Sequence, residues 1–395
     1  MSTVYDVISY PIYFVTQKPY KALSESARQK SVRVNHNTWK RLEPNDVNER
    51  HFIEECQTVA ELFSRAVTVF SDKNCFGFRR VLAEEDERQP DGKVFRKLHL
   101  QDYEWFTYTQ IESRVEHVAR GLRALGVKEG DPVVIFAETR IEWMLTAQAL
   151  FRLGAAVVTL YATLGEEAVI HGINETEAVV VVTTHDLLPK LNFDRLSRVK
   201  HVVFIEGLKK TNFTSTQVSF QSFSQLEANG SGAGPLPSVT ISAQSTAVLM
   251  YTSGSTGVPK AVMISHENLL HAIRAFFAIS HALSEGDVYC AYLPLAHVLE
   301  LAAELFFFCL GHSVGFATPL TLTSRSTALK RGVAGDTSLL KPTVMCAVPT
   351  VLDRIRKSIE GEVVKKGAIS RAIFHFSVEY KKKWTQRGFR TVCPI

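Results

Sequence analysis

Between residues 131 and 205 the chain repeats a pattern that few folds can accommodate. Short, continuously apolar runs are predicted to be buried strands, at residues 131–137, 156–161, 178–184 and 201–205. Stretches predicted to be helical separate them, at residues 141–153, 166–174 and 185–196. Because the strands are apolar throughout, both faces of their sheet must be covered. The pattern predicts an α/β fold, with a parallel-rich sheet flanked by helices, and argues against a β-sandwich.

Further elements are predicted on both sides of this repeat. Apolar spacing predicts helices at residues 52–70, 108–125, 267–277, 299–310, 351–359 and 369–384. Strands are predicted at residues 247–251, 288–293, 313–318 and 342–349. Residues 82–97 are charged and contain a Gln-Pro-Asp-Gly turn signal, which predicts a hairpin. Residues 229–237 are rich in Gly and Pro and are predicted to be a flexible connector.

The first 50 residues differ from the rest in charge. The net charge of the 395-residue chain is +5, and the segment from Lys18 to Arg41 holds seven Lys or Arg and one acid. The basic charge therefore belongs to this segment and does not indicate a nucleic-acid-binding body. We expect an irregular basic leader over residues 1–50 and one large domain over residues 51–395.

An apolar run at residues 7–15 precedes the basic segment and is too short to span a bilayer. Two interpretations stay open. The leader can contact an anionic membrane surface, or it can pack on the domain with its charges solvated. The six cysteines form no CxxC pair, which excludes the usual zinc and redox spacings and fits a reducing compartment.

The stretch from Tyr251 to Lys260 reads Tyr-Thr-Ser-Gly-Ser-Thr-Gly-Val-Pro-Lys and follows a predicted strand. Its glycines permit positive φ and close approach of a ligand, and successive N–H groups can bind an anion. The hydroxyls can donate hydrogen bonds or bind Mg²⁺, and the lysine can neutralise phosphate. The candidate phosphate-binding residues are Thr252, Ser253, Gly254, Ser255, Thr256, Gly257 and Lys260.

Two well-known nucleotide-binding motifs do not match this stretch. The glycines are three residues apart and Pro259 precedes the lysine, so the stretch is neither a Walker loop nor a dinucleotide fingerprint. A plain surface loop is the ordinary interpretation of a Gly/Ser/Thr run. The strand before it, the lysine at its end and the helix soon after it favour a ligand-binding role.

The ten residues resemble the signature of the adenylate-forming superfamily, which includes acyl-CoA synthetases, luciferases and peptide-synthetase adenylation domains. The resemblance implies a loop that closes over the β- and γ-phosphates of ATP, with Mg²⁺ bound through Thr252 or Thr256. It also implies the large N-terminal domain of that fold, here incomplete and without the small C-terminal lid domain. Ala261 stands where a glycine is common in the family.

A second group of residues is Tyr-Leu-Pro-Leu-Ala-His-Val-Leu-Glu, from Tyr292 to Glu300. Taken alone, His297 is most often a packed polar residue, and no second His or Cys stands at zinc spacing. Leu-Pro-Leu-x-His is similar to the next block of the superfamily, which implies that His297 borders the substrate carboxylate. Glu300 is expected in the first turn of a helix. Phe306, Phe307 and Phe308 are interpreted as core residues or, alternatively, as a wall of an acyl tunnel.

Several stretches resemble eukaryotic long-chain acyl-CoA synthetases: Glu-Thr-Arg-Ile-Glu-Trp-Met from Glu138, Leu-Tyr-Ala-Thr-Leu-Gly from Leu160, and His-Gly-Ile-Asn-Glu from His171. The resemblance implies ATP-dependent, AMP-forming activation of a long-chain fatty acid to an acyl-adenylate, followed by thioester formation with CoA. It also implies an enzyme on the cytosolic face of the endoplasmic reticulum or another intracellular membrane, or otherwise in the cytoplasm.

The family's later segments, Tyr-Gly-x-Thr-Glu and Thr-Gly-Asp, do not occur in the sequence, so the catalytic residues are expected beyond Ile395. We therefore expect the chain to be truncated, poorly stable and nearly inactive by itself, because missing strands leave an apolar sheet edge. Two alternatives stay open: an enzyme that adenylates another carboxylic acid, and a non-catalytic nucleotide-binding or regulatory fragment. A membrane adaptor is the weakest interpretation.

Overall fold

The computed structural model describes residues 10, 14–27, 31–42, 55–88, 92, 94–208, 216–252, 259–279, 283–284 and 286–389. The chain divides into two compact units. The larger one is Asp46–Cys346, and the smaller one combines Met1–Asn45 with Ala347–Ile395. None of the helices in the described ranges is both long enough and apolar enough to cross a bilayer.

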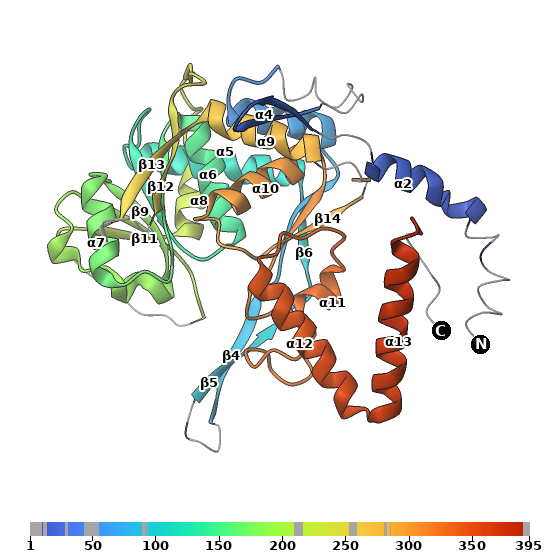
Figure 1. Ribbon diagram of the computed structural model, residues 1–395. Helices are drawn as coiled ribbons and strands as arrows, with labels where there is room; N and C mark the ends of the chain where they lie inside the picture. The colour runs from blue at the N-terminus through green and yellow to red at the C-terminus, as the bar shows by residue number, and fades with distance from the viewer. Residues whose placement is uncertain are drawn as a thin grey trace. The chain divides into compact units, whose positions relative to one another are not determined.

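A seven-stranded sheet forms one part of the larger unit (Figure 1). Its order is β11-β10-β9-β7-β8-β12-β13, and every neighbouring pair is parallel except the antiparallel β12–β13 pair at one edge. The strands are β7 (Pro132–Phe136), β8 (Ala156–Leu160), β9 (Val180–Thr184), β10 (His201–Ile205), β11 (Ser219–Ser222), β12 (Thr246–Thr252) and β13 (Lys260–Ser265).

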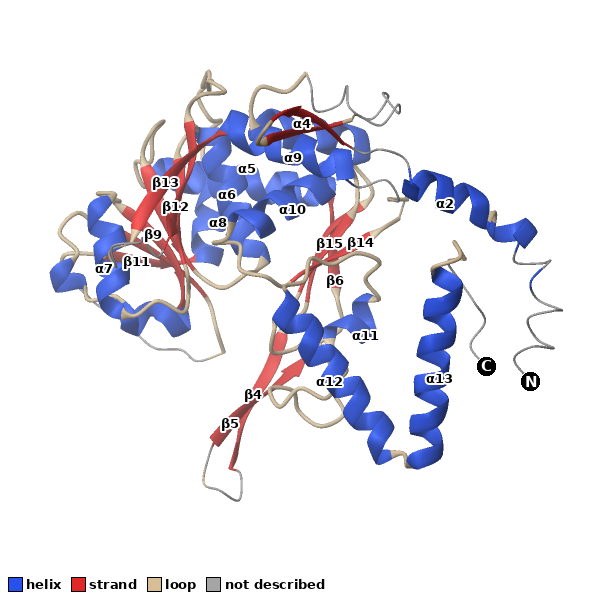
Figure 2. Cartoon of the chain, viewed as in Figure 1, coloured by secondary structure: helices blue, strands red, loops and turns tan. Residues whose placement is uncertain are grey.

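The central strands are buried on both faces. In β7, Val133 and Ile135 belong to one hydrophobic cluster, whereas Val134 and Phe136 belong to a second. Helices α5 (Tyr108–Ala124), α6 (Ile141–Leu153) and α8 (Phe223–Ser231) contribute to the first cluster. Helix α7 (Glu166–Glu175) contributes to the second, together with residues around the 3₁₀ helices η1 (His185–Lys190) and η2 (Phe193–Arg195). Helices therefore cover both faces, as Figure 2 shows.

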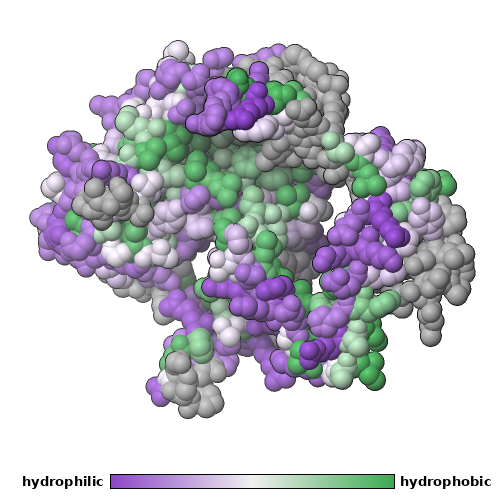
Figure 3. Space-filling model, in the orientation of Figure 1, coloured by the Kyte–Doolittle hydropathy of each residue, from purple (hydrophilic) through white to green (hydrophobic). Residues whose placement is uncertain are grey.

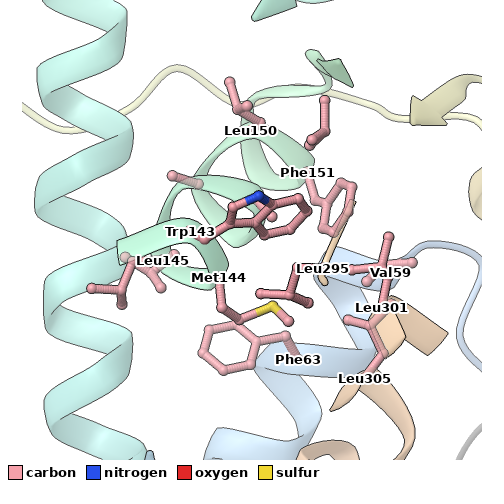
Figure 4. Close-up of a cluster of buried hydrophobic side chains, with 14 of the residues drawn as sticks. Val59, Phe63, Trp143, Met144, Leu145, Leu150, Phe151, Leu295, Leu301 and Leu305 are labelled. Carbon is pink, nitrogen blue, oxygen red and sulfur yellow. The ribbon is translucent and has the colours of Figure 1, made fainter. Parts of the chain in front are cut away.

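The first cluster extends away from the sheet to α4 (Val59–Phe70), α9 (His266–Ile279) and α10 (Val298–Cys309). In Figure 4, Trp143 of α6 lies among side chains from α4 and α10. Thr58 accepts a hydrogen bond from the Glu61 backbone and so begins α4. Each fully buried Leu or Phe of this cluster contributes roughly 1.5–3 kcal/mol, so the cluster stabilises the larger unit.

A four-stranded sheet of order β14-β15-β3-β6 completes the core of the larger unit. It contains β3 (Asn74–Phe78), β6 (Glu104–Thr107), β14 (Val288–Ala291) and β15 (Ser313–Phe316). Phe308 of α10 packs edge-on against Phe63 and Phe76. Because Phe306, Phe307 and Phe308 are all buried, the core-packing interpretation of these residues is confirmed.

The remaining elements of the larger unit are a hairpin and a short helix. The hairpin pairs β4 (Val81–Arg88) with β5 (Val94–Leu100), and α11 is Asp336–Leu340. A buried ion pair connects Arg79, just after β3, to Asp336 at the start of α11, with 2.7 Å between Nη1 and Oδ1. This pair ties together two segments that lie far apart in the sequence.

The smaller unit contains α2 (Pro19–Ala27), the hairpin β1 (Ser31–Asn35) with β2 (Thr38–Arg41), α12 (Pro349–Lys365) and α13 (Ala368–Thr385). Trp384 is a buried large side chain of this unit and packs against Tyr10 and Phe389, with ring centroids 5.7 and 5.2 Å away. Gly388 has a φ of 87° and lies so close to Pro19 that a Cβ atom would be only 2.5 Å from the Pro19 carbonyl oxygen.

The α/β architecture with a parallel-rich sheet is confirmed, but three local predictions are wrong. The leader holds α2, β1 and β2 and is not irregular in its described part. Residues 342–349 are not a strand: Val344 makes an isolated bridge with Tyr289, and Pro349 already begins α12. Residues 229–231 end α8 and are not a connector. The helical prediction for residues 185–196 is confirmed as two short 3₁₀ helices, η1 and η2. Strands β3, β6, β11 and β13 were not predicted.

Candidate functional site

The predicted phosphate-binding stretch joins β12 to its antiparallel neighbour β13, which is the edge strand of the sheet. Thr252 ends β12, Lys260 begins β13, and the two residues are directly paired. The Thr252 hydroxyl lies 3.4 Å from the Lys260 carbonyl oxygen. The predicted residues between them, Ser253, Gly254, Ser255, Thr256 and Gly257, lie outside the described residues. The structure thus brings Thr252 and Lys260 together at the base of the stretch.

This base lies at the carboxyl end of the parallel strands. Because β12 is parallel to β8, and β8 to β7, the last residues of the three strands meet at the same edge. Crevices outside the carboxyl ends of strands are the usual ligand sites of open α/β sheets. Both Thr252 and Lys260 are exposed there. A hydroxyl and an ammonium group suit phosphate oxygens.

The described residues bear on how a metal ion could bind at this site. Within them, no group of three or more His, Cys, Asp or Glu side chains could hold one. Mg²⁺ commonly binds through only one or two protein groups together with substrate phosphates and water. Thr252 therefore fits a site in which the ion arrives with a nucleotide, and the described part of the chain does not fit a protein-only metal site.

His297 is the N-cap residue of α10 and is exposed. Its Nδ1 accepts a hydrogen bond from the Leu299 backbone N–H at 3.1 Å. An accepting Nδ1 carries no proton, so the neutral imidazole carries its proton on Nε2 and can donate it to a ligand oxygen. The interpretation of His297 as a packed polar residue is wrong, because its ring is accessible.

A hydrogen-bonded threonine ties the segment before His297 to the larger sheet. Thr139 lies three residues after β7, and its hydroxyl donates to the Leu293 carbonyl at 2.5 Å. The same hydroxyl accepts from the Leu295 N–H at 2.9 Å. The loop that presents His297 is therefore fixed to the carboxyl end of β7, the edge at which β12 also ends.

Apolar side chains are exposed next to His297 and on β13. Val298 and Leu299, next to His297, are 39% and 41% exposed, and Met263 of β13 is 70% exposed. Figure 3 shows hydrophobic side chains gathered across the part of the surface where β13 and α10 lie. Such a surface beside polar groups is typical of a site for a ligand with an apolar body and a polar end.

Sequence reasoning placed Glu300 in the first turn of α10, which the structure confirms, but it missed the burial of this residue. Glu300 and Glu304 are both fully buried, one turn apart. Glu300 Oε2 accepts from the Tyr289 hydroxyl at 2.8 Å. Burial raises the pKa of both carboxyl groups well above the usual range. The apolar spacing of α10 gave no signal for this pair.

The parallel-rich sheet, the exposed lysine at its carboxyl edge and the histidine that caps α10 are features that α/β domains with a ligand site at this edge share. The AMP-binding enzyme family matches residues 82–387, which is most of the chain, and the chain belongs to that family.

Curated relatives indicate which members of the AMP-binding enzyme family the chain is similar to. The chain is 38% identical over 337 residues to long chain acyl-CoA synthetase 8 of Arabidopsis thaliana, covering 84% of this chain and 46% of the relative. It is 28% identical over 365 residues to long-chain-fatty-acid–CoA ligase 1 of Schizosaccharomyces pombe, covering 87% and 53%. The chain thus spans about half the length of the curated relatives it matches.

Solved structures support the same fold. The adenylation domain of a carboxylate reductase from Mycobacterium chelonae has a TM-score of 0.66 and 19% identity, covering 83% of this chain and 51% of that one. A putative long-chain-fatty-acid CoA ligase from Rhodopseudomonas palustris has a TM-score of 0.58 and 23% identity, covering 76% and 65%. At these identities the likeness concerns the fold.

Proposed function

We propose that the chain forms the ATP- and acid-binding part of a long-chain fatty acid–CoA ligase. In the proposed reaction the fatty-acid carboxylate attacks the α-phosphate of ATP, which gives acyl-adenylate and pyrophosphate. The thiol of CoA then displaces AMP and forms the thioester. The observation that carries the proposal is the exposed Lys260 at the carboxyl edge of the sheet, paired with Thr252, in a chain of the AMP-binding enzyme family.

The described residues have distinct roles in this proposal. Lys260 offsets the negative charge of the phosphates, and Thr252 offers a hydroxyl to them or to a nucleotide-bound Mg²⁺. Bound with the nucleotide, Mg²⁺ supplies charge neutralisation. His297 donates from Nε2 to a carboxylate oxygen of the acid, and the exposed Val298 and Leu299 contact the apolar chain beside it. These groups act by positioning and charge stabilisation.

ATP binding to the 395-residue chain tests the proposal. We expect titration calorimetry to detect Mg²⁺-ATP binding, and Lys260→Ala to weaken it on the order of tenfold because one charge-assisted contact is lost. Lys128→Ala is the matched control, because Lys128 is exposed and precedes the amino end of β7, at the opposite edge of the sheet. Absent binding, or equal binding by the wild type and Lys260→Ala, would contradict the proposal.

A screen of acids distinguishes the proposed substrate class from its alternative. Carboxylate reductase adenylation domains share the fold, so acids other than fatty acids must be compared. We expect palmitate, in the presence of ATP, to protect the chain against thermal unfolding more than an aromatic acid such as benzoate. Stronger protection by benzoate favours adenylation of a different acid, and binding of ATP with no effect of any acid favours a nucleotide-binding fragment.

We also propose that the smaller unit contacts an anionic membrane surface and places the protein at the cytosolic face of an intracellular membrane. Two observations support this: the excess of Lys and Arg between Lys18 and Arg41, and the exposure of Tyr20 and Trp39, at 60% and 63%. Aromatic residues beside basic ones suit the interface of a bilayer.

Sedimentation with vesicles tests the membrane proposal. We expect the chain to sediment with phosphatidylserine-containing vesicles at low salt, and less with vesicles of phosphatidylcholine alone. Trp39→Ala should reduce binding because an aromatic anchor is lost. Equal sedimentation with both kinds of vesicle, or none with either, would count against this proposal.

A further inference from the structure

One turn of α7 contacts both strand ends of the β12–β13 hairpin. His171 and Glu175 are four residues apart, so their side chains share one face of the helix. Tyr251 stands one residue before the end of β12, and Pro259 immediately precedes β13. Glu175 contacts Tyr251, and His171 contacts Pro259. Two residues of one helix thus reach both sides of the candidate phosphate-binding stretch.

The contact with β12 is polar and close. The Tyr251 hydroxyl lies 2.5 Å from Glu175 Oε2 and 3.2 Å from the Gly172 carbonyl oxygen. Both oxygens are acceptors, so the hydroxyl is the donor. Burial, with the neighbouring Glu175, raises the pKa of Tyr251, which keeps the phenol protonated. Tyr251 is only 4% exposed, so a phenylalanine would fill the same space and lack only the hydroxyl with its contacts to Glu175 and Gly172.

Gly172 lets the helix approach the strands this closely. A Cβ atom at Gly172 would lie 2.7 Å from Leu160 Cδ2 and 3.5 Å from the Tyr251 ring. A distance of 2.7 Å is a steric clash with a neighbouring strand. The absence of a side chain at this position therefore sets the distance between α7 and the end of β8, the strand next to β12, and leaves the Tyr251 ring in van der Waals reach.

The contact with β13 comes from the same face. His171 Nε2 lies 3.4 Å from the Pro259 carbonyl oxygen and 3.7 Å from Glu175 Oε2. The imidazole packs edge-on against the Tyr251 ring, with centroids 6.5 Å apart at 76°. A carbonyl only accepts, so His171 donates from Nε2. His171, Glu175, Tyr251 and Pro259 form one group, which we call the α7 clamp.

The position of the α7 clamp has a consequence for ligand binding. Holding both strand ends lowers the entropy that would be lost when Thr252 and Lys260 are ordered around a ligand. Packing alone would not require the carboxylate, because a leucine at position 175 could cover the same ring. The carboxylate of Glu175 is therefore suited to fixing the orientation of the Tyr251 ring.

We propose that His171 and Glu175 are positioning residues, which hold the ends of β12 and β13 so that Thr252 and Lys260 meet the phosphates of ATP. This inference rests on the proposed function. It extends that function from the residues that would touch the nucleotide to two residues of α7 that would not.

The test combines local hydrogen exchange with ATP binding in the 395-residue chain. We expect Tyr251→Phe and Glu175→Leu each to increase amide exchange in peptides covering β12 and β13 on the order of fivefold, the effect of one lost hydrogen bond. ATP binding should weaken by a similar factor. Glu175→Gln keeps an acceptor oxygen and should restore most of both properties. The double variant should be no worse than either single one.

Glu167→Gln is the matched control, because Glu167 lies on the same helix and pairs with Arg195 away from the hairpin. Unchanged exchange in β12 and β13 after Tyr251→Phe and Glu175→Leu would overturn the inference. An increase spread evenly over all peptides would also overturn it, since that result indicates global destabilisation. If the wild type binds no ATP, the proposed function fails, and exchange still decides whether the clamp holds the strand ends.

Discussion

At the residue scale, His266 illustrates how an ordinary side chain becomes sensitive to pH through burial. It begins α9, is 1% exposed, and packs edge-on against Phe151. Its Nδ1 accepts a hydrogen bond from the Val59 N–H at 3.4 Å, which requires an unprotonated nitrogen. Burial lowers the pKa of His266 from 6.5 to about 4.

This shift predicts a loss of stability in acid. Between pH 6.5 and about 4 the unfolded chain binds a proton at His266 that the folded chain excludes, so the free energy of unfolding falls as the pH falls. The loss reaches about 3 kcal/mol for this shift. His266→Asn keeps an acceptor for Val59 and should flatten the profile in denaturant titrations from about pH 7 to about 4.5. His271→Asn, at an exposed position of the same helix, should retain the wild-type profile.

Single residues also show which parts of the site were predictable. Lys260 and His297 were predicted from short patterns that depend only on neighbours in the chain. Glu175 and His171 approach the hairpin from a helix that lies 76 and 88 residues earlier than their partners Tyr251 and Pro259. Their roles depend on how α7 packs. No local sequence pattern indicates how α7 packs, so the α7 clamp could be recognised only from the structure.

At the scale of elements, α10 contains an unusual feature of its own. All but its first two residues are buried, yet Glu300 and Glu304 stand one turn apart within that face. Among the described residues, neither carboxyl oxygen of Glu304 has a hydrogen-bond partner. Burial raises the pKa of both groups, and the charge of Glu300 raises that of Glu304 further.

The pair predicts a pH dependence opposite to that of His266. Above the ordinary carboxyl pKa of 4.5 the unfolded chain releases protons that the folded chain retains, so stability falls as the pH rises from about 5 toward about 8. Glu304→Gln mimics the protonated acid and should raise the free energy of unfolding more at about pH 8 than at about pH 5. The same increase in the free energy of unfolding at both pH values would contradict the prediction. Glu129→Gln, at an exposed position, is the control.

Elements also differ in how well their sequences predict them. Helix α6 was predicted with its observed bounds, and in the structure Gly154, with a φ of 69°, ends it with a left-handed residue. Helix α8 was missed although Ser222 and Gln225 form a capping box, a signal that the sequence contains. Strand β13 was missed because its pairing with β12 depends on the turn before it, and residues 342–349 were overpredicted because apolar character was taken for pairing.

At the scale of the whole molecule, the buried pair of Arg79 and Asp336 joins residues 257 positions apart. The two side chains are 4% and 2% exposed. Arg79 also donates to the Ala334 carbonyl, and Thr321 donates to Asp336. Burial raises the pKa of Asp336, while Thr321 and Arg79 act in the opposite direction. The pair secures the segment before α11 to the end of β3.

Breaking one side of this pair should be costly. Arg79→Met leaves a buried carboxylate without its cation and should reduce the free energy of unfolding by about 3–5 kcal/mol. Adding Asp336→Asn should recover part of the loss. Arg80→Met removes the neighbouring exposed pair with Glu104 and should cost less than about 1 kcal/mol. Similar losses for Arg79→Met and Arg80→Met in denaturant titrations would show that burial does not control the effect.

The strand order of the four-stranded sheet determines when, during translation, β3 can complete its pairing. Strand β3 pairs with β6 on one side, about 30 residues later, but its other neighbour, β15, follows about 240 residues later. At about 5–20 residues per second, a ribosome needs on the order of 10–50 s to deliver that second neighbour. Until then one side of β3 presents unpaired backbone groups to other chains. During that interval the unpaired side of β3 is open to pairing with other chains, and slower synthesis lengthens the interval.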